Sequence, residues 1–166
     1  MPNSQVARVA QRVSLVFAGL FAGFLVAVLV LELSLRDLDG QAYTEVRLAE
    51  LDSLDRLATG TLLPALLATA LLAVFAYKAD RRRPLLALTA LALLVAVLAL
   101  TLVVNLPINT DQLDWNVQSP PTDWMSVRDR WQLAHALRTG AAVAAFGVLI
   151  AAATRTPPGR PVASAG

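Results

Sequence analysis

Cysteine is absent from the 166-residue chain, and charged residues are few. The lack of cysteine excludes disulfides, thiolate nucleophiles, iron–sulfur clusters and cysteine-ligated zinc. Charged residues make up 16% of the chain, against about 25% in a typical soluble domain. Hydrophobic residues make up 57%, which is more apolar surface than a soluble protein of this size can bury. The composition therefore predicts a membrane protein whose first partner is the lipid bilayer.

Four stretches of the chain are almost free of charge. Each has close to the ~20 residues that cross a hydrocarbon core of roughly 30 Å; they are residues 13–35, 57–77, 84–106 and 133–154. Helix is expected because backbone groups find no partner in lipid, and alternation of the strand type is absent. The first stretch is longer than the apolar run of a signal peptide, so we expect an uncleaved anchor. The sequence predicts a single all-α domain, a bundle of four transmembrane helices.

Basic residues gather on one side of the predicted membrane. Four spans place the amino terminus, the loop 78–84 and a tail at 156–166, expected to be disordered, on the same side. That side carries eight of the fourteen Lys and Arg residues, but only Asp80 among the acids. The positive-inside rule then predicts a multi-pass protein of the cell membrane with both termini in the cytoplasm. The run Arg81–Arg83 is a topology signal under this interpretation, and no nucleic-acid partner is predicted.

Two segments connect the spans on the outer side, at residues 36–60 and 107–130. The first has leucine at every third position with charged residues between, at Leu48, Leu51, Leu54 and Leu57. This pattern predicts an amphipathic helix that runs straight into the second span. The second segment predicts a loop over residues 109–121 and a helix with Thr122 as its N-cap. We expect both helices to extend beyond the membrane and to roof the outer end of the bundle.

The first span carries small residues one turn apart, at Gly19, Gly23 and Ala27. Such a strip lets another helix approach closely, so this face is predicted to pack against a neighbour.

Polar side chains recur where the predicted spans meet the outer side. Glu32 ends the first span, and Asn105 and Asn109 end the third. The fourth helix carries four residues at spacings that form one stripe, with Trp124 a turn earlier; these are Arg128, Trp131, His135 and Arg138. Ionisable groups within a membrane usually face the bundle interior or a wet cavity. We therefore expect a polar site at the outer end of the bundle.

His135 is the only histidine, and its unperturbed pKa is the one that lies near neutrality. It is therefore the first candidate base for proton chemistry. No metal site is predicted, because one His without Cys and without an H-E-x-x-H motif leaves few ligands. No cofactor is predicted either, although a haem held by His135 alone stays open. Phosphate loops, catalytic serine motifs and dinucleotide fingerprints are absent.

Structural explanations of the same residues stay open. Arg138 could pair with Glu32 or extend its head group outward along its own stem. Trp115, Trp124 and Trp131 could form an interfacial aromatic belt. Asn105 and Asn109 could cap the carbonyls that Pro107 frees, and a lone histidine is often a hydrogen-bonded structural residue.

Two motifs stand close together in the second half of the chain: Asn105-x-Pro-x-Asn109, and Asp123-Trp124-x-x-x-Arg128-x-Arg130-Trp131-x-x-x-His135-x-x-Arg138. Together they resemble the anthrone oxygenase-like family of small membrane proteins, and Gly19-x-x-x-Gly23 fits as well. The resemblance implies a four-helix membrane protein and, in some fungal members, oxidation of an anthrone to an anthraquinone by molecular oxygen.

The resemblance also implies roles for individual residues. His135 would be the base or a hydrogen-bond partner, and Arg138 and Asn105 would hold the phenolate or enolate oxygen. Trp131 would pack on a flat aromatic substrate, and we expect Asn109, Arg128, Trp124 and Glu32 to line the same binding site.

Two hypotheses about function follow. The first is an enzyme, an oxygenase or isomerase that needs little cofactor chemistry and acts on a lipophilic aromatic. The second is a non-catalytic binding, sensing or accessory subunit whose polar cluster is structural, and it predicts a closed hydrogen-bonded network without a ligand-sized cavity. A transporter ranks third, because four spans are few and such a function would require a homo-oligomer.

Overall fold

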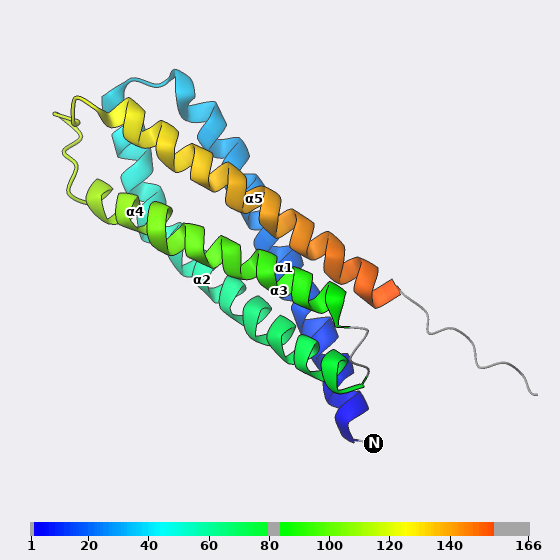
Figure 1. Cartoon of the computed structure of the whole chain (residues 1–166). Coiled ribbons are helices and arrows are strands. Elements are labelled where there is room, and N and C mark those ends of the chain that lie inside the picture. Colours follow the sequence, from blue (N-terminus) through cyan, green and yellow to red (C-terminus); the bar gives the residue numbers. More distant parts are fainter. Residues whose placement is uncertain (1, 80–83, 155–166) are drawn as a thin grey trace, which may run out of the picture.

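The computed structural model describes residues 2–79 and 84–154, and these are helical almost throughout (Figure 1). The elements in chain order are α1 (Pro2–Ser34), the 3₁₀ turn η1 (Leu35–Asp37), α2 (Gly40–Ala79), α3 (Leu85–Leu100), the π-helical segment η2 (Thr101–Asn105), α4 (Leu106–Gln112) and α5 (Trp124–Thr154). Four segments are long and apolar enough to cross a membrane: Gln5–Asp37, Ser53–Lys78, Leu85–Gln112 and Trp124–Thr154. The predicted all-α architecture with four spanning helices is confirmed. The loop Arg81–Arg83 and the tail 156–166 lie outside the described residues.

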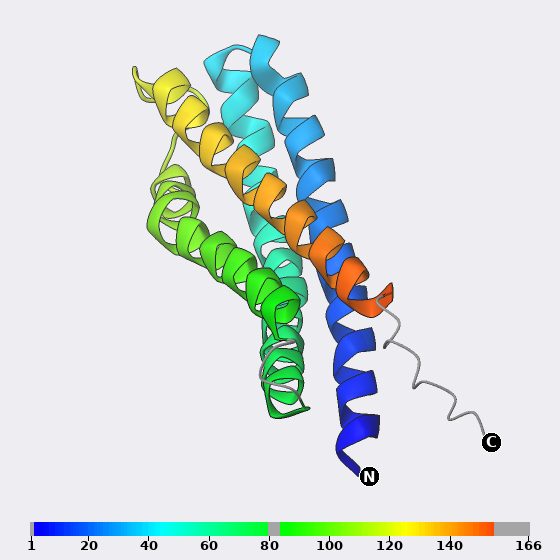
Figure 2. The same cartoon turned by 45° about the vertical axis from the view of Figure 1, so that its right-hand side comes forward.

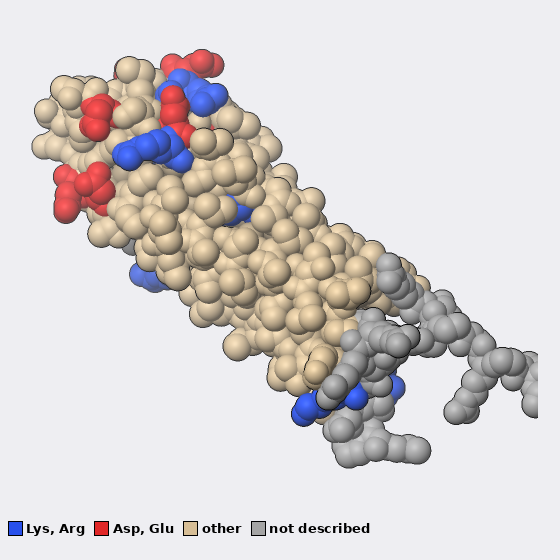
Figure 3. Space-filling model, viewed as in Figure 1, with Lys and Arg blue, Asp and Glu red and all other residues tan. Residues whose placement is uncertain are grey.

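The long helices run side by side in a bundle (Figures 1 and 2). α1 packs against α2 and α5, while α3 packs against α5 and α2. One end of the bundle holds the starts of α1 and α3 and the ends of α2 and α5 (Figure 2). The opposite end holds η1, the start of α2, α4 and the start of α5, and we call it the polar end. In Figure 3 the acidic side chains on the visible face gather there, whereas the middle of the bundle is free of acids.

The apolar core fills the middle of the bundle with small and medium side chains from α1, α2, α3 and α5. Its fully buried members include Ala18, Leu25, Ala65, Leu94 and Ala145. Alanine at these positions lets the helices approach closely, which is how helices in lipid gain packing energy.

The face that α1 turns inward differs from the predicted strip of small residues. Gly23 and Ala27 are exposed, and only Gly19 approaches a neighbour, where an added Cβ would lie 3.0 Å from Phe146 Cε2. The buried stripe runs instead through Ala18 and Leu25. This buried stripe continues along the same helix face to Glu32 at the polar end, so one face of α1 serves both the apolar core and the polar network.

α2 confirms the predicted continuity of the charged segment with the second span. It passes through Gly60 and Pro64 without a break. The predicted leucine stripe lies inward only in part, because Leu51 is buried and Leu54 lines a cavity while Leu57 is exposed. Tyr43 and Arg47 are buried on the same helix. The leucine pattern therefore located part of the inward face but not its polar members, since buried polar side chains on α2 find partners on other helices.

Pro107 shapes the end of the third span. Proline has no N–H and its ring clashes with the carbonyl four residues earlier, so a regular α-helix cannot continue through it unchanged. The chain instead forms the π-helical segment η2 just before Pro107, in which the Leu106 N–H donates to the Thr101 carbonyl. The helix then continues through α4 to Gln112, so the loop predicted to start at Asn109 starts only after Gln112. The last helix begins at Trp124, two residues after the predicted cap at Thr122.

Candidate functional site

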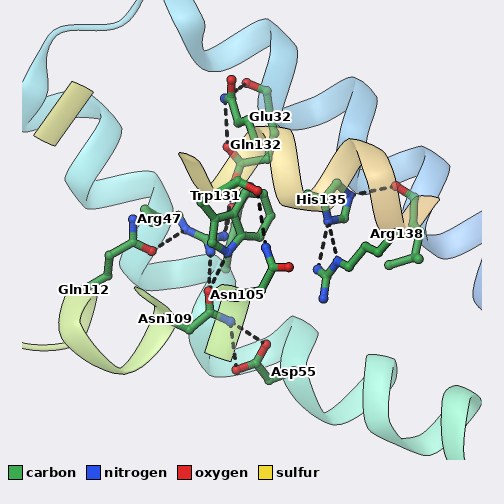
Figure 4. Close-up of polar contacts among 12 residues, drawn as sticks. Glu32, Arg47, Asp55, Asn105, Asn109, Gln112, Trp131, Gln132, His135 and Arg138 are labelled. Atoms are coloured by element: carbon green, nitrogen blue, oxygen red, sulfur yellow. Dashed lines mark hydrogen bonds and ion pairs between the residues drawn. The ribbon is translucent and has the colours of Figure 1, made fainter. Parts of the chain in front are cut away.

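Polar side chains from four helical segments meet inside the polar end (Figure 4). Glu32 comes from α1, Arg47 from α2, Asn109 from α4, and His135 and Arg138 from α5. All five are buried. Because buried polar groups must be hydrogen-bonded to be stable, the contacts among them define the site.

Arg47 lies at the centre of this network. Its Nη1 donates to Glu32 Oε1 at 3.0 Å and to Glu50 Oε2 at 3.1 Å. Its Nε donates to Gln112 Oε1 at 3.0 Å, and its Nη2 donates to Asn109 Oδ1 at 2.8 Å. A guanidinium offers five N–H donors in a planar fork, so one side chain can join α1, α2 and α4.

Glu32 is paired with Arg47 and not with Arg138. The amide of Gln132 also donates to it, to Oε2 at 3.2 Å and to its backbone carbonyl at 2.9 Å. The interpretation that Arg138 pairs with Glu32 is therefore wrong, because an arginine from the charged segment of α2 reaches the carboxylate instead.

Trp131 is enclosed by this network, with 2% of its surface exposed, and so does not belong to an interfacial belt. Its Nε1 donates to Asn109 Oδ1 at 2.7 Å. Its ring stacks on His135 with centroids 4.8 Å apart, and the guanidinium carbon of Arg47 lies 4.0 Å from the ring centroid. Trp131 thus positions the imidazole and the guanidinium while part of it lines the small cavity described below.

Both ring nitrogens of His135 are engaged. Nδ1 lies 3.1 Å from Arg138 Nε and 2.8 Å from Arg138 Nη2, and Nε2 lies 3.0 Å from the Leu25 carbonyl oxygen. A guanidinium can only donate, so Nδ1 is the acceptor and Nε2 carries the proton that it donates to Leu25. His135 is therefore neutral here, and its lone pair is directed at Arg138. Neither nitrogen is free to ligate a haem iron in this arrangement.

Arg138 is a buried cation with 7% of its surface exposed. Besides His135 it contacts the Thr101 hydroxyl, which accepts from Nη1 at 3.3 Å. Within residues 2–79 and 84–154, no carboxylate forms an ion pair with Arg138. A buried charge is stable only when it is compensated, so Arg138 is suited to receive an anion.

The two asparagines that flank Pro107 do not cap its freed carbonyls. Asn105 donates through Nδ2 to the Trp131 carbonyl at 3.3 Å, and its buried Oδ1 has no partner. Asn109 accepts from Arg47 and Trp131 and donates to Asp55 Oδ1 at 3.2 Å. Asn105 therefore offers a free acceptor, whereas Asn109 is fully committed to the network.

A small cavity lies inside the network, with a volume of about 20 Å³. A volume of this size holds about one water molecule. Side chains from α1, α2, α4 and α5 line it, and the polar ones are Arg47, Glu50, Asp55, Asn109 and Arg138. The polar network is thus nearly closed, and a larger ligand enters only if these side chains move.

Five predicted site residues do not line this cavity: His135, Asn105 and Glu32, which belong to the surrounding network, and Arg128 and Trp124, which make other contacts. Arg128 donates to the Arg36 carbonyl at 3.2 Å and to Asp129 at 3.1 Å, and it lies over the ring of Trp124. Trp124 in turn stacks on Tyr43, with ring centroids 5.4 Å apart. These contacts tie α5 to η1 and α2, so Arg128 and Trp124 build the roof of the polar end and do not line the cavity.

The residues that α2 contributes to the site, above all Arg47, Glu50 and Asp55, are not among those predicted from the sequence. A usable signal was present, because Glu32 is an acid within an apolar span and such a group requires a partner. Arg47 was one of few cations on the same predicted side of the membrane.

Among the described residues, no group of three or more acidic or histidine side chains is placed to hold a metal ion.

The fold and the buried polar end define a small multi-pass membrane protein with four apolar helices. The family model for anthrone oxygenase matches residues 56–148, which is more than half of the chain. The protein therefore belongs to the anthrone oxygenase family. No significant match was found among curated proteins or among solved structures. The matched range includes Asn105, Trp131, His135 and Arg138, whereas Glu32, Arg47 and Glu50 precede it.

Proposed function

We propose that this protein is an enzyme that acts on a lipophilic, anthrone-like aromatic at the polar end of the bundle, either as an oxygenase that oxidises it or as an isomerase that moves a proton within it. The observation that carries the proposal is Arg138, a buried cation beside the cavity without a carboxylate ion-pair partner in the part of the chain that the structure describes. An enolate or phenolate oxygen would place a negative charge in direct contact with this guanidinium. Membership of the anthrone oxygenase family supports this substrate class.

The proposed reaction begins at an acidic C–H bond of the substrate. Removal of the proton leaves an electron pair that is delocalised onto the carbonyl oxygen, and Arg138 stabilises this oxyanion. Molecular oxygen then reacts at carbon, so that one CH₂ group becomes a carbonyl and one water is released. An isomerase would instead return the proton to a different atom of the enolate.

His135 supports this chemistry as a hydrogen-bond partner in the observed arrangement. Its Nδ1 accepts two N–H groups of Arg138 and so fixes the direction of the guanidinium. It becomes a base only if Arg138 moves away. Asn105 Oδ1, which is buried and unpartnered, would accept a hydrogen bond from a substrate hydroxyl.

Substitution of Arg138 tests the proposal. Arg138→Gln should lower the rate of anthrone oxidation by about a hundredfold, the usual cost of losing one oxyanion donor. The rate is measured as oxygen uptake and anthraquinone absorbance in lipid nanodiscs, after subtraction of the uncatalysed oxidation. Arg130→Gln is the matched control, because Arg130 is an exposed arginine on the same helix. Equal rates for Arg138→Gln and the wild type would exclude this mechanism.

A second candidate is a non-catalytic binding or accessory module. The nearly closed network and the cavity of about 20 Å³ favour it, because a three-ring substrate does not fit without rearrangement. Saturable quenching of Trp fluorescence by a hydroxyanthraquinone, without any oxidation of anthrones by the wild type, would support this module over the enzyme.

We also propose that the polar end faces away from the cytoplasm. The cationic residues at the opposite end, with Arg8, Arg12 and Lys78 among those that the structure describes, support this orientation by the positive-inside rule.

A further inference from the structure

Glu50 is a buried carboxyl group at the cavity of the polar end. It lies on α2 with 9% of its surface exposed, and it lines the cavity together with Arg138 and Trp131. Its Oε2 accepts from Arg47 Nη1 at 3.1 Å, while its Oε1 is buried without a hydrogen-bond partner. An unpartnered carboxyl oxygen at a cavity is free to interact with whatever enters it.

The negative charge of an ionised Glu50 is only partly neutralised by its surroundings. Glu32 from α1 shares the same Arg47 nitrogen, so two carboxylates compete for one guanidinium. Asp55 on α2 adds a third acid at the cavity, and Arg138 on α5 lies across it. Gln132 additionally stabilises Glu32 as a carboxylate, whereas Glu50 has Arg47 alone. Glu50 is therefore the member of the pair that holds a proton more readily.

The pKa of Glu50 agrees with this assignment. Burial raises it, the negative charge of Glu32 raises it further, and Arg47 lowers it, with a net value of about 7. A carboxylate with a pKa near the working pH is well suited to act as a general base, because it is both available and strong enough.

We propose that Glu50 is the general base of this site and that its Oε1 takes the proton from the substrate C–H bond. The inference rests on the proposed function. In the step, the C–H bond breaks and an O–H bond forms on Oε1, while the electron pair stays on the substrate as an enolate beside Arg138. Dioxygen is the oxidant that then accepts these electrons, and the proton leaves Glu50 to water during release of the product.

The geometry favours Glu50 over His135 for this role. The only lone pair of the neutral His135 ring is covered by two N–H groups of Arg138, at 3.1 and 2.8 Å. Glu50 Oε1 has no such partner, and Glu50 is one of the residues that line the cavity, which His135 is not. Glu50 also precedes the range that the family model matches, so family membership alone does not point to it.

The test compares Glu50→Gln with Glu45→Gln. Glu45 lies on the same helix but is exposed, so it is a matched control for the loss of one carboxylate from α2. Anthrone oxidation is followed as oxygen uptake in nanodiscs across the pH range around 7, with the uncatalysed reaction subtracted. A base acts only when deprotonated, so the wild-type and Glu45→Gln rates should rise with pH with a midpoint near the Glu50 pKa of about 7.

Glu50→Gln should lose about a hundredfold in rate and lose this pH-dependent rise. Binding of a hydroxyanthraquinone should stay within a few-fold of the wild type, because Arg138 is unchanged. If Glu50→Gln keeps the wild-type rate and pH profile, the inference is overturned while the proposed function stands. If the wild type does not oxidise anthrones at all, the proposed function itself fails.

A second measurement tests the assignment even if Glu50→Gln loses activity because it folds poorly. The infrared spectrum of the wild type should contain a carboxylic acid C=O band that titrates near pH 7, which is the Glu50 pKa. The same band should persist in Glu45→Gln and be absent from Glu50→Gln. A wild-type spectrum without any buried carboxylic acid band below this pH would overturn the assignment without reference to activity.

Discussion

Arg47 is the residue on which the polar end depends most for its stability. It binds two carboxylates and two amide oxygens that belong to α1, α2 and α4. A buried ion pair gains little over well-packed apolar residues, but removal of one partner leaves the other charge buried and unpaired. The stability of the whole end is therefore sensitive to one side chain.

Arg47→Met should lower the free energy of unfolding by about 3–5 kcal/mol, because Glu32 then stays buried without its cation. Thermal or denaturant unfolding in detergent measures the loss. Arg56→Met is the control, since Arg56 is exposed on the same helix. The double variant with Glu32→Gln should recover part of the loss. An Arg47→Met protein as stable as the control would contradict the assigned pairing.

Glu50 should also make stability depend on pH. Its pKa is about 7 in the folded protein, above the ordinary 4.5, so the folded state binds the proton more tightly than the unfolded state. Its effect on stability is therefore most favourable below pH 4.5 and is lost as the pH rises toward 7. The melting temperature of the wild type should fall across this window relative to Glu50→Gln. Parallel curves for the two proteins would contradict the shift.

Individual site residues were predictable from the sequence only where they lie on one helix. The spacing of Trp131, His135 and Arg138 fixes a common stripe, and all three are buried side by side. Contacts between helices were not predictable in the same way. Whether Glu32 pairs with Arg47 or Arg138 depends on the rotation of α2 about its axis, which no periodicity of leucines determines.

At the level of helices, the apolar runs and their lengths were sufficient to predict the four spans, because lipid allows few alternatives to helix. The local deviations were not predictable to the same degree. Pro107 signals a disturbance, yet the disturbance could have ended the helix. The π-helical segment η2 lets the helix continue and brings Asn105 and Asn109 inside together.

The packing of α1 gives a test at the level of one helix. Gly19 lies against Phe146, with 3.0 Å from an added Cβ to Cε2, whereas no atom lies within 4 Å of a Cβ added at Gly23. Gly19→Leu should lower the melting temperature, because Phe146 must move. Gly23→Leu should leave it unchanged or raise it slightly, since glycine disfavours helix by about 1 kcal/mol. Equal effects at both positions would show that α1 is rotated relative to this structure.

The whole molecule is polar at one end and cationic at the other. In the part of the chain that the structure describes, the acids, the buried network and the cavity all belong to the polar end (Figures 3 and 4). Under the proposed function, a lipophilic substrate would reach this site from the membrane, and the charged steps would take place at the polar end. This division of one bundle into an apolar scaffold and a polar end is consistent with both candidate functions.

The orientation of the bundle can be tested because the chain contains no cysteine. Single variants Ser119→Cys, at the polar end, and Lys78→Cys, at the cationic end, each carry one thiol at an exposed position. A membrane-impermeant maleimide applied to intact cells should label Ser119→Cys and should label Lys78→Cys only after permeabilisation, because basic residues are retained in the cytoplasm. The opposite pattern would reverse the proposed topology and would place the Glu50 and Arg138 site on the cytoplasmic side.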